Sequence, residues 1–201
     1  MGNPITGKRI VLGVTGSIAA YKAAEIASAL TKIGADIDTV LTEAAAKFVS
    51  PLTFQSVSGR KAFCEADLWG GEGHVVHINL ARKADLIVIA PCSANTIAKL
   101  ANGIADNLLT VTVLAARCPI VIAPAMDAGM YGHEATQANV EKLKQRGVLF
   151  IGPAEGHLAS GLKGPGRMVE PEEIAQYIRY AFSRDNYLQG KHILITAGGT
   201  R

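Results

Sequence analysis

The sequence predicts an α/β protein: a doubly wound, Rossmann-like parallel sheet with helices on both faces. Three observations carry this prediction. Short apolar runs alternate with helical patterns along the whole 201-residue chain. These runs are continuously apolar, which is typical of strands buried on both faces. With 49% hydrophobic and only 5% aromatic residues, the composition suits a core of Ala, Val, Ile and Leu.

The first half of the chain contains the clearest strand-to-helix transition. A run at 9–14 ends in Thr15-Gly16-Ser17-Ile18, after which helical spacing continues to Gly34, a plausible C-cap. The same criteria predict further strands and helices in this half. The strands are 36–41 and 86–90, and the helices are 43–49, 51–58 and 77–83. A turn or loop is expected at 69–73, where glycines cluster.

The second half repeats the alternation. Loops are expected at 91–96 and 124–127, each directly after an apolar strand. The predicted helices are 97–103, 107–116, 134–147 and 171–184, and the predicted strands are 119–123 and 148–151.

The last residues start a new pattern. Residues 191–196 (KHILIT) have the composition of a strand and lead into Ala197-Gly198-Gly199-Thr200-Arg201. A strand feeding a glycine-rich turn is typical of the opening of a nucleotide-binding unit. We therefore expect one domain at 1–185, and a linker plus the first strand of a truncated second domain at 186–201.

Charge and cysteine content exclude several functional classes. A net charge of +3 without a Lys/Arg cluster argues against nucleic acid, and no apolar run is long enough for a membrane span. The three cysteines, Cys64, Cys92 and Cys118, form no CxxC pair and have no metal-ligand spacing, so no metal is expected. An odd cysteine count without a secretion signal favours a reducing cytoplasm.

Hydroxyl-rich loops follow several predicted strands. They are Thr15-Gly16-Ser17-Ile18, Thr42 and Pro91-Cys92-Ser93-Ala94-Asn95-Thr96. Oriented N–H groups at helix N-termini together with hydroxyls suit a phosphate. Helix capping explains each loop taken alone; their recurrence at successive strand ends favours a ligand site. Since there is no Walker loop and no G-x-G-x-x-G, a monophosphate such as that of FMN is favoured over a dinucleotide or triphosphate.

The run 158–168 (LASGLKGPGRM) has three glycines and a proline, and so it is neither an ordinary helix nor a central strand. It carries Ser160, Lys163 and Arg167, which suits a lid or clamp over a ligand; the alternative is a long surface connection. His77 heads a predicted helix, where it is either a cap or packed residue or a group that titrates near neutral pH. No role is expected for His133, His157 or His192.

Five short motifs together resemble the homo-oligomeric flavin-containing cysteine decarboxylases, from about residue 8 to residue 181. They are Gly16-Ser17-Ile18-Ala19-Ala20-Tyr21-Lys22, His77-Ile78, Ser93-Ala94-Asn95-Thr96, Pro124-Ala125-Met126 with Met130, and Gly164-Pro165-Gly166-Arg167-Met168. The nearest branch is the phosphopantothenoylcysteine decarboxylase half of the bacterial bifunctional coenzyme A biosynthesis protein. The terminal GKHILITAGGTR looks like the opening of its phosphopantothenate–cysteine ligase domain.

The resemblance implies FMN bound between neighbouring subunits of a trimer, with dodecamers in the full-length form. It also implies conversion of 4'-phosphopantothenoylcysteine to 4'-phosphopantetheine through a thioaldehyde, loss of CO2 and re-reduction. FMN would be held by Gly16, Ser17, Ile18, Thr42, Ser93, Ala94, Asn95, Thr96 and Ala125. His77 and Ser160 would be catalytic, and Asp127, Ala159, Gly161, Arg167 and Met168 would bind substrate.

Two residues depart from the family pattern. Asp127 stands where many members have Asn, and an ionised Asp accepts hydrogen bonds but repels a substrate carboxylate. Either its surroundings keep it protonated or it contacts a substrate N–H. Ser160 stands where many members have a proton-donating cysteine, and a hydroxyl is far less acidic than a thiol. The departures leave open a non-catalytic flavin-binding regulatory protein, against which His77 counts. A peptidyl-cysteine decarboxylase with a different clamp is a second alternative, against which the ligase-like tail counts; a prenyl-flavin-forming relative fits the last two motifs less well.

Overall fold

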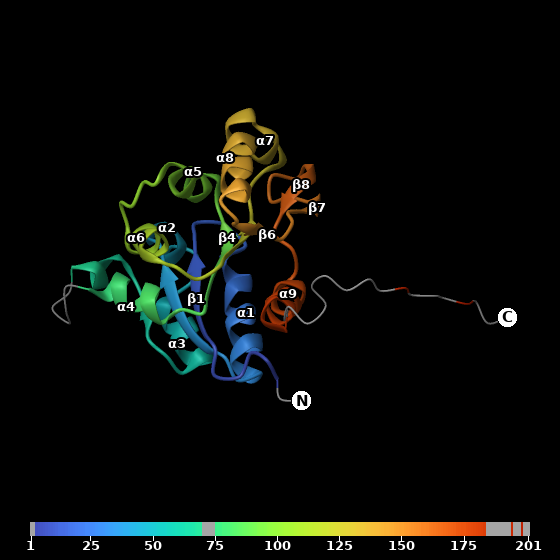
Figure 1. The fold of residues 1–201 in the computed structure, drawn as a ribbon. Helices are drawn as coiled ribbons and strands as arrows, with labels where there is room; N and C mark the ends of the chain where they lie inside the picture. The colour runs from blue at the N-terminus through green and yellow to red at the C-terminus, as the bar shows by residue number, and fades with distance from the viewer. Residues whose placement is uncertain (1–2, 70–74, 184–193, 195–197, 199–201) are drawn as a thin grey trace.

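The computed structural model describes residues 3–69, 75–183, 194 and 198 (Figure 1). Its main element is a six-stranded parallel sheet in the order β3-β2-β1-β4-β5-β6, which confirms the predicted doubly wound fold. The strands are β1 (Arg9–Val14), β2 (Asp36–Leu41), β3 (Ala62–Phe63), β4 (Leu86–Cys92), β5 (Ile120–Pro124) and β6 (Leu149–Phe150). The strand order reverses between β1 and β4, where ligands of such sheets bind.

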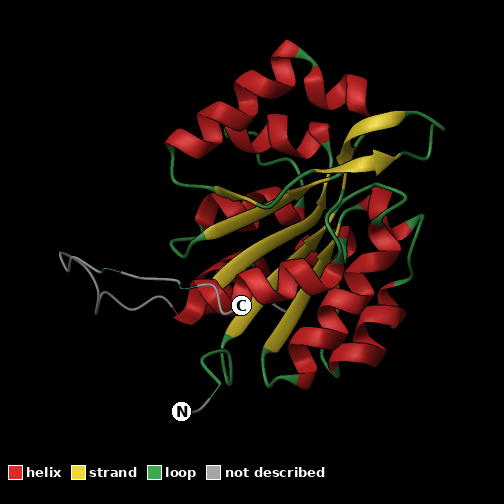
Figure 2. Ribbon diagram, turned by 90° about the vertical axis from the view of Figure 1, so that its right-hand side faces the viewer, coloured by secondary structure: helices red, strands yellow, loops and turns green. Residues whose placement is uncertain are grey.

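Helices cover both faces of this sheet (Figure 2). One face is covered by α1 (Ala20–Lys32), α3 (Pro51–Ser58) and α9 (Pro171–Ser183). The other is covered by α4 (Val76–Lys83), α5 (Ala94–Asn102), α6 (Leu108–Ala115) and α8 (Glu134–Gln145). The short helices are α2 (Glu43–Ala46), α7 (Ala128–Gly132) and the 3-10 turn η1 (Glu65–Leu68). No helix among the described residues is long and apolar enough to cross a membrane.

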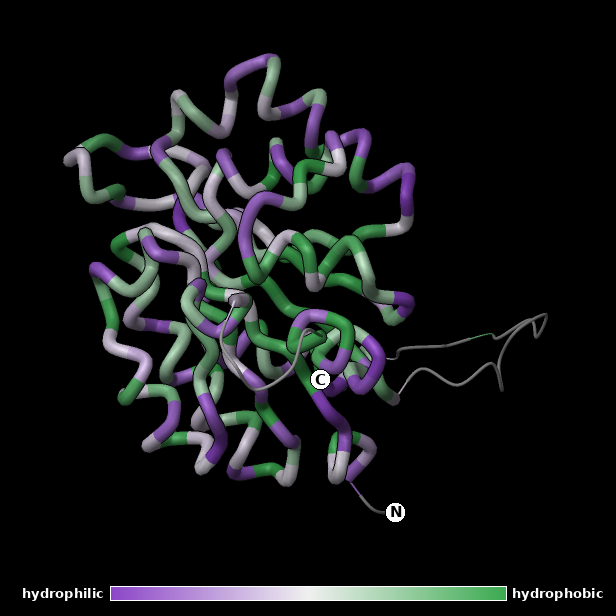
Figure 3. Tube along the Cα trace, turned by 90° about the vertical axis from the view of Figure 1, so that its left-hand side faces the viewer, coloured by the Kyte–Doolittle hydropathy of each residue, from purple (hydrophilic) through white to green (hydrophobic). Residues whose placement is uncertain are grey.

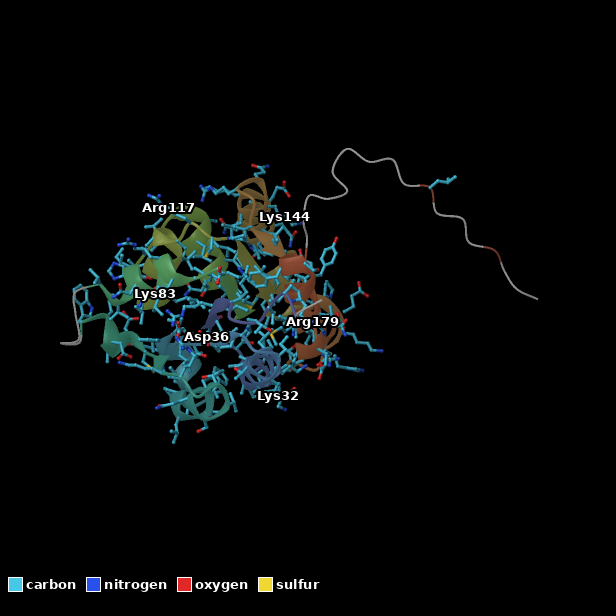
Figure 4. All side chains as sticks on the ribbon, turned by 60° about the horizontal axis from the view of Figure 1, so that its bottom comes forward. Lys32, Asp36, Lys83, Arg117, Lys144 and Arg179 are labelled. Atoms are coloured by element: carbon cyan, nitrogen blue, oxygen red, sulfur yellow. The ribbon has the colours of Figure 1, made fainter. Side chains whose placement is uncertain are left out.

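The core consists of two apolar layers, one on each side of the sheet. Successive side chains of a strand point to opposite faces, so Leu12 packs toward α1 and α9 while Val11 packs toward α6. Figure 3 shows the hydrophobic segments gathered along the central strands. Exposed charged residues such as Lys83, Arg117 and Lys144 extend from the periphery (Figure 4). The sheet therefore forms a rigid base for the loops at its carboxyl edge.

The predicted loop at 91–96 is largely wrong. β4 extends through Cys92 and α5 begins at Ala94, so only Ser93 separates the two elements. Ser93 caps the helix by accepting a hydrogen bond from the Thr96 backbone N–H at 3.4 Å. A single capping serine thus replaces the expected loop, and Ala94, Asn95 and Thr96 form the first helical turn.

The run at 158–168 is also more ordered than expected. Strands β7 (Ala154–His157) and β8 (Lys163–Arg167) pair antiparallel into a separate hairpin, and only 158–162 is a turn. Pro165 is tolerated because a two-stranded ribbon consists of edge strands, and Gly166 adopts a φ of 151°. The hairpin lies beside α7 at one end of the molecule (Figure 1).

The expected linker and second-domain strand at 186–201 fall outside the described residues, apart from two single positions, and so does most of the turn at 69–73. The elements that the patterns missed, β3, η1, α7 and the hairpin, are all short. Such segments offer too few positions for a hydrophobic period to appear.

Candidate active site

A cavity of about 880 Å³ opens at the carboxyl ends of β1, β4 and β5. Three groups of residues line it: the loops after the strands, the first turns of α1, α2 and α5, and the β7–β8 hairpin. Its position at the reversal of strand order is where the fold favours a ligand. Its volume lies within the range of small-molecule and cofactor sites.

Hydroxyls at or near helix N-termini form one wall of the cavity; Thr42 and Ser93 cap α2 and α5, whereas α1 has no side-chain cap. Thr42 Oγ1 accepts from the Ala45 N–H at 3.2 Å, and Ser17 Oγ accepts from the Ala19 N–H at the same distance. With Ser93 on α5, three loops direct hydroxyls and helix N-termini toward one space. Ser17 and Thr42 can therefore also bind a ligand, since a hydroxyl that accepts from a backbone N–H still has its own proton to donate; the Ser93 hydroxyl donates to Thr96 Oγ1 at 3.3 Å.

Gly16 makes this wall possible by a close backbone approach. A Cβ atom built on Gly16 would lie 2.5 Å from the Cβ of Ala44, which no real pair of side chains shows. The loop after β1 thus lies directly against the first turn of α2. A larger residue at position 16 would push the two loops apart and change the shape of the cavity.

Thr15 belongs to the hydroxyl-rich loop after β1 but was not among the predicted cofactor residues; it joins the carboxyl ends of β1 and β4 beside the cavity. Its side chain is 1% exposed, and its Oγ1 donates to the Pro91 carbonyl and accepts from the Ser93 N–H, both at 2.9 Å. The hydroxyl therefore fixes the loop after β1 to the start of α5. Its position directly after an apolar strand was the only feature of the sequence that pointed to this bridge.

We expect Thr15→Val to destabilise the protein and weaken ligand binding, while Thr15→Ser does neither to the same extent. Valine leaves the buried Ser93 N–H without its acceptor, at a cost of about 1–3 kcal/mol. Pro91 keeps its bond from the Thr15 backbone N–H at 3.2 Å, so only one group is orphaned. Urea unfolding of the two variants measures the difference. Equal stabilities would show that the hydroxyl bridge has no structural importance.

Asp127 and Ser160 meet on the opposite side of the cavity. Asp127 caps α7, with Oδ1 accepting from the Gly129 N–H at 2.9 Å, and Ser160 Oγ donates to Oδ2 at 2.6 Å. The bonds from Ser160 and then Gly129 hold the pKa of the Asp127 carboxyl below its ordinary value. Of the two alternatives considered for Asp127, the structure therefore favours the ionised carboxylate.

Glu170 ties the base of the hairpin to α1. One of its oxygens pairs with Lys22 Nζ at 2.7 Å, and the other pairs with the Arg167 guanidinium. The Lys22 bond, followed by the charges of both cations, lowers the pKa of Glu170. Lys22 and Arg167 both line the cavity, so this carboxylate partly neutralises two cations that face a ligand.

We expect Glu170→Gln to lower the melting temperature slightly at pH 7 and not at all in acid. The depressed pKa means that the bridge contributes fully above the ordinary value of 4.5 and is lost as pH falls through the folded-state pKa. Exposed pairs contribute less than about 1 kcal/mol, so the shift is small. Thermal unfolding between pH 3 and 7 checks this, with Glu25→Gln on the exposed side of α1 as control. A pH-independent difference would contradict it.

Comparison with known proteins agrees with this geometry. The family model "Flavoprotein" matches residues 2–183. The coenzyme A biosynthesis bifunctional protein CoaBC of Bacillus subtilis is 45% identical, over 98% of this chain and 49% of its own length. The chain thus spans about half the length of the curated relatives it matches.

Solved structures give the same result. A variant of PPC decarboxylase complexed with pantothenoylaminoethenethiol superposes with a TM-score of 0.80 at 32% identity, covering 89% of this chain and all of that one. The FMN binding protein AtHal3 superposes at 0.76 and 32% identity, covering 87% and 96%. The chain belongs to the flavoprotein family. The family resemblance drawn from the sequence motifs is thereby confirmed.

The cavity of this flavoprotein fits a flavin mononucleotide. The missing Cβ of Gly16 lets the loop after β1 lie directly against α2, and loops at three helix N-termini surround the cavity. Every predicted cofactor residue lines the cavity: Gly16, Ser17, Ile18, Thr42, Ser93, Ala94, Asn95, Thr96 and Ala125. N–H groups and hydroxyls at helix N-termini suit a phosphate group.

Only some of the residues predicted to be catalytic or to bind substrate lie around the cavity. Asp127, Ala159, Ser160, Arg167 and Met168 line the cavity, whereas Gly161 belongs to the hairpin turn and does not. His77 is half-buried in the first turn of α4, which packs against α6 and η1, and it lies outside the lining of this chain's cavity. Several residues that line the cavity had been given no role in the predicted site: Tyr21, Glu65, Lys99, Asp106, Asn107 and His157.

Proposed function

We propose that this chain is an FMN-dependent decarboxylase that converts 4'-phosphopantothenoylcysteine to 4'-phosphopantetheine in coenzyme A biosynthesis. One observation carries the proposal: a flavin-sized cavity at the strand-order reversal is covered by a hairpin that presents Ser160 and Arg167 opposite the capping loops. The relatives that cover 98% of this chain at 45% identity support coenzyme A biosynthesis over a peptide substrate.

FMN would lie against the loops after β1, β2 and β4, with its phosphate at the N-termini of the helices. The hydroxyls of Ser17 and Thr42 then have protons available for phosphate oxygens, whereas the Ser93 hydroxyl donates to Thr96 Oγ1 at 3.3 Å. When bound, FMN supplies the two-electron redox chemistry of the reaction. Ala125, 5% exposed at the end of β5, forms a flat apolar floor beside this space.

The hairpin side of the cavity would hold the substrate. Arg167 and Lys22 give this wall positive charge that suits an anionic ligand, and Met168 contributes an apolar surface. The ionised Asp127 accepts hydrogen bonds only, so it suits a substrate N–H better than a substrate carboxylate. The hairpin also excludes water from one side of the site.

Self-association as a trimer would complete the site, in our proposal, by bringing a neighbour's His77 to the cavity rim. Its support is an apolar rim that a single chain leaves exposed: Ile18 is 60%, Tyr21 55% and Met130 52% exposed. In the full-length protein, a C-terminal ligase domain would assemble these trimers further, in the cytoplasm. Light scattering of the purified chain measures the mass; a monomer that still turns over substrate would contradict this part.

The decisive experiment is incubation of the flavin-loaded protein with 4'-phosphopantothenoylcysteine, followed by product mass. Loss of CO2 without net oxidation is the expected result. Loss of CO2 with an oxidised enethiol product would locate a defect at the final proton transfer, where Ser160 replaces a thiol. A flavin-loaded protein without turnover would overturn the proposal and favour a regulatory role.

A further inference from the structure

The two residues that depart from the family pattern touch each other. Asp127 and Ser160 are 33 positions apart in the sequence, and Ser160 Oγ lies 2.6 Å from Asp127 Oδ2. One residue begins α7 and the other occupies the hairpin turn. The sequence motifs do not predict this contact, because it depends on how the hairpin packs against α7.

The Asp127–Ser160 hydrogen bond contains one proton, which belongs to the serine hydroxyl. An ionised carboxylate only accepts, so the single proton of the Ser160 hydroxyl lies between the two oxygens. Asp127 Oδ1 is already engaged by the Gly129 N–H at 2.9 Å. The Ser160 oxygen therefore keeps free lone pairs but no proton to offer the cavity that it lines.

The backbone fixes the distance between the two side chains. The Met126 N–H donates to the Gly166 carbonyl at 2.9 Å, immediately before Asp127. Gly164 approaches Ala128 so closely that a Cβ on the glycine would lie 2.9 Å from the alanine Cβ. Other charged or titratable groups on the packed elements are Glu155 and His157 on β7, Lys163 and Arg167 on β8, and Tyr131 on α7. Of these, Arg167 pairs with Glu170.

We propose that Asp127 is a positioning residue that acts through Ser160: its carboxylate accepts the hydrogen bond that the Ser160 hydroxyl donates, so the Ser160 oxygen faces the ligand as a hydrogen-bond acceptor. The matching ligand group is a donor, an N–H or S–H of a thiol-bearing amide. The ligand class rests on the proposed function, whereas the coupling of the two side chains does not. Ser160 would thus accept a hydrogen bond from the ligand, where a proton-donating thiol at this position would donate one.

A cysteine placed at position 160 reports on this coupling. In Ser160→Cys the thiol faces an ionised carboxylate, which stabilises the neutral S–H and repels the thiolate, so the pKa of the thiol rises. Asp127→Asn removes that charge and leaves α7 capped, since Asn caps helices as well as Asp. The thiol pKa in Ser160→Cys should therefore exceed that in the double variant by about one pH unit.

The measurement is the pH dependence of iodoacetamide alkylation, determined from the mass of one tryptic peptide. Cleavage after Arg146 and Lys163 releases residues 147–163, which contain no native cysteine, so Cys64, Cys92 and Cys118 do not interfere. Asp106→Asn, combined with Ser160→Cys, is the matched control, because Asp106 lines the cavity but pairs with Lys99 at 2.7 Å. This control should leave the thiol pKa unchanged.

Equal thiol pKa values in Ser160→Cys with and without Asp127→Asn would overturn the inference. A drop of equal size with Asp106→Asn would also overturn it, because the effect would then reflect total charge. The titration needs no substrate, so it separates two failures. If the protein turns over substrate but the two thiol pKa values are equal, the proposed function stands and the coupling is overturned. If the protein is inactive but the two pKa values differ, the coupling stands and the proposed function is overturned.

Discussion

Gly166→Ala is expected to reduce substrate turnover by about two orders of magnitude while leaving flavin absorbance in place. The added Cβ would overlap the carbonyl oxygen of Met126 and lie 3.2 Å from the Asp127 carbonyl carbon. Both are backbone atoms at the end of β5, so neither moves aside. Alanine also disfavours the glycine φ of 151°, which adds about 1–3 kcal/mol of strain.

The hairpin would respond by moving away from α7. The Met126–Gly166 hydrogen bond at 2.9 Å would break, and Ser160 would separate from Asp127. Steady-state kinetics of the flavin-loaded variant measure the loss. Gly132→Ala on α7 is the control, since its added Cβ would meet nothing within 4 Å. Parent-like turnover in Gly166→Ala would show that the hairpin position is irrelevant to the reaction.

Gly16→Ala is expected to give a folded protein that no longer retains flavin. The new methyl group would lie 2.5 Å from the Cβ of Ala44, so the loop after β1 and the start of α2 must separate. Thr42, which caps α2, would move with them and take its hydroxyl out of line with Ser17. Overlap of this kind typically costs about 1–3 kcal/mol, which is about 5- to 150-fold in affinity if most of it falls on the bound state.

A second substitution tests the cause directly. Ala44→Gly removes the atom that collides, so Gly16→Ala combined with Ala44→Gly should recover flavin binding. Visible absorbance after gel filtration, normalised to protein, measures the bound flavin in all four proteins. Ala44→Gly alone serves as the control and should bind flavin. Full flavin content in Gly16→Ala would exclude a steric role for the glycine.

The sequence was most informative where the chain repeats a long regular pattern. Strands such as β1 and β2 were predicted with correct bounds, because an apolar run followed by a turn leaves little choice of register. The gathering of residues from the ends of β1, β2 and β4 around one cavity was predicted for a related reason: the carboxyl ends of parallel strands must meet at one edge. Composition at the strand ends then indicated the kind of ligand.

Prediction failed where a structure depends on contacts between distant segments. The run around Pro165 lacks any strand-like period, and it becomes β8 only because β7 lies beside it. The Asp127–Ser160 pair and the Glu170 bridge have the same origin, since each joins elements brought together by the whole fold. The bridge from Thr15 to Ser93 was not predicted either, because it depends on the pairing of β1 with β4.

The hairpin differs from a hinged lid in how its base is anchored. Met168 and Val169, directly after β8, are 2% and 6% exposed, and Ile151 just before β7 is 9% exposed. All three belong to the core layer beneath α1 and α9. Swinging the hairpin as a unit would therefore disturb the core, whereas bending its turn at 158–162 would not. Ligand exchange should proceed by fraying of the tip, so its rate is decoupled from the global stability of the protein.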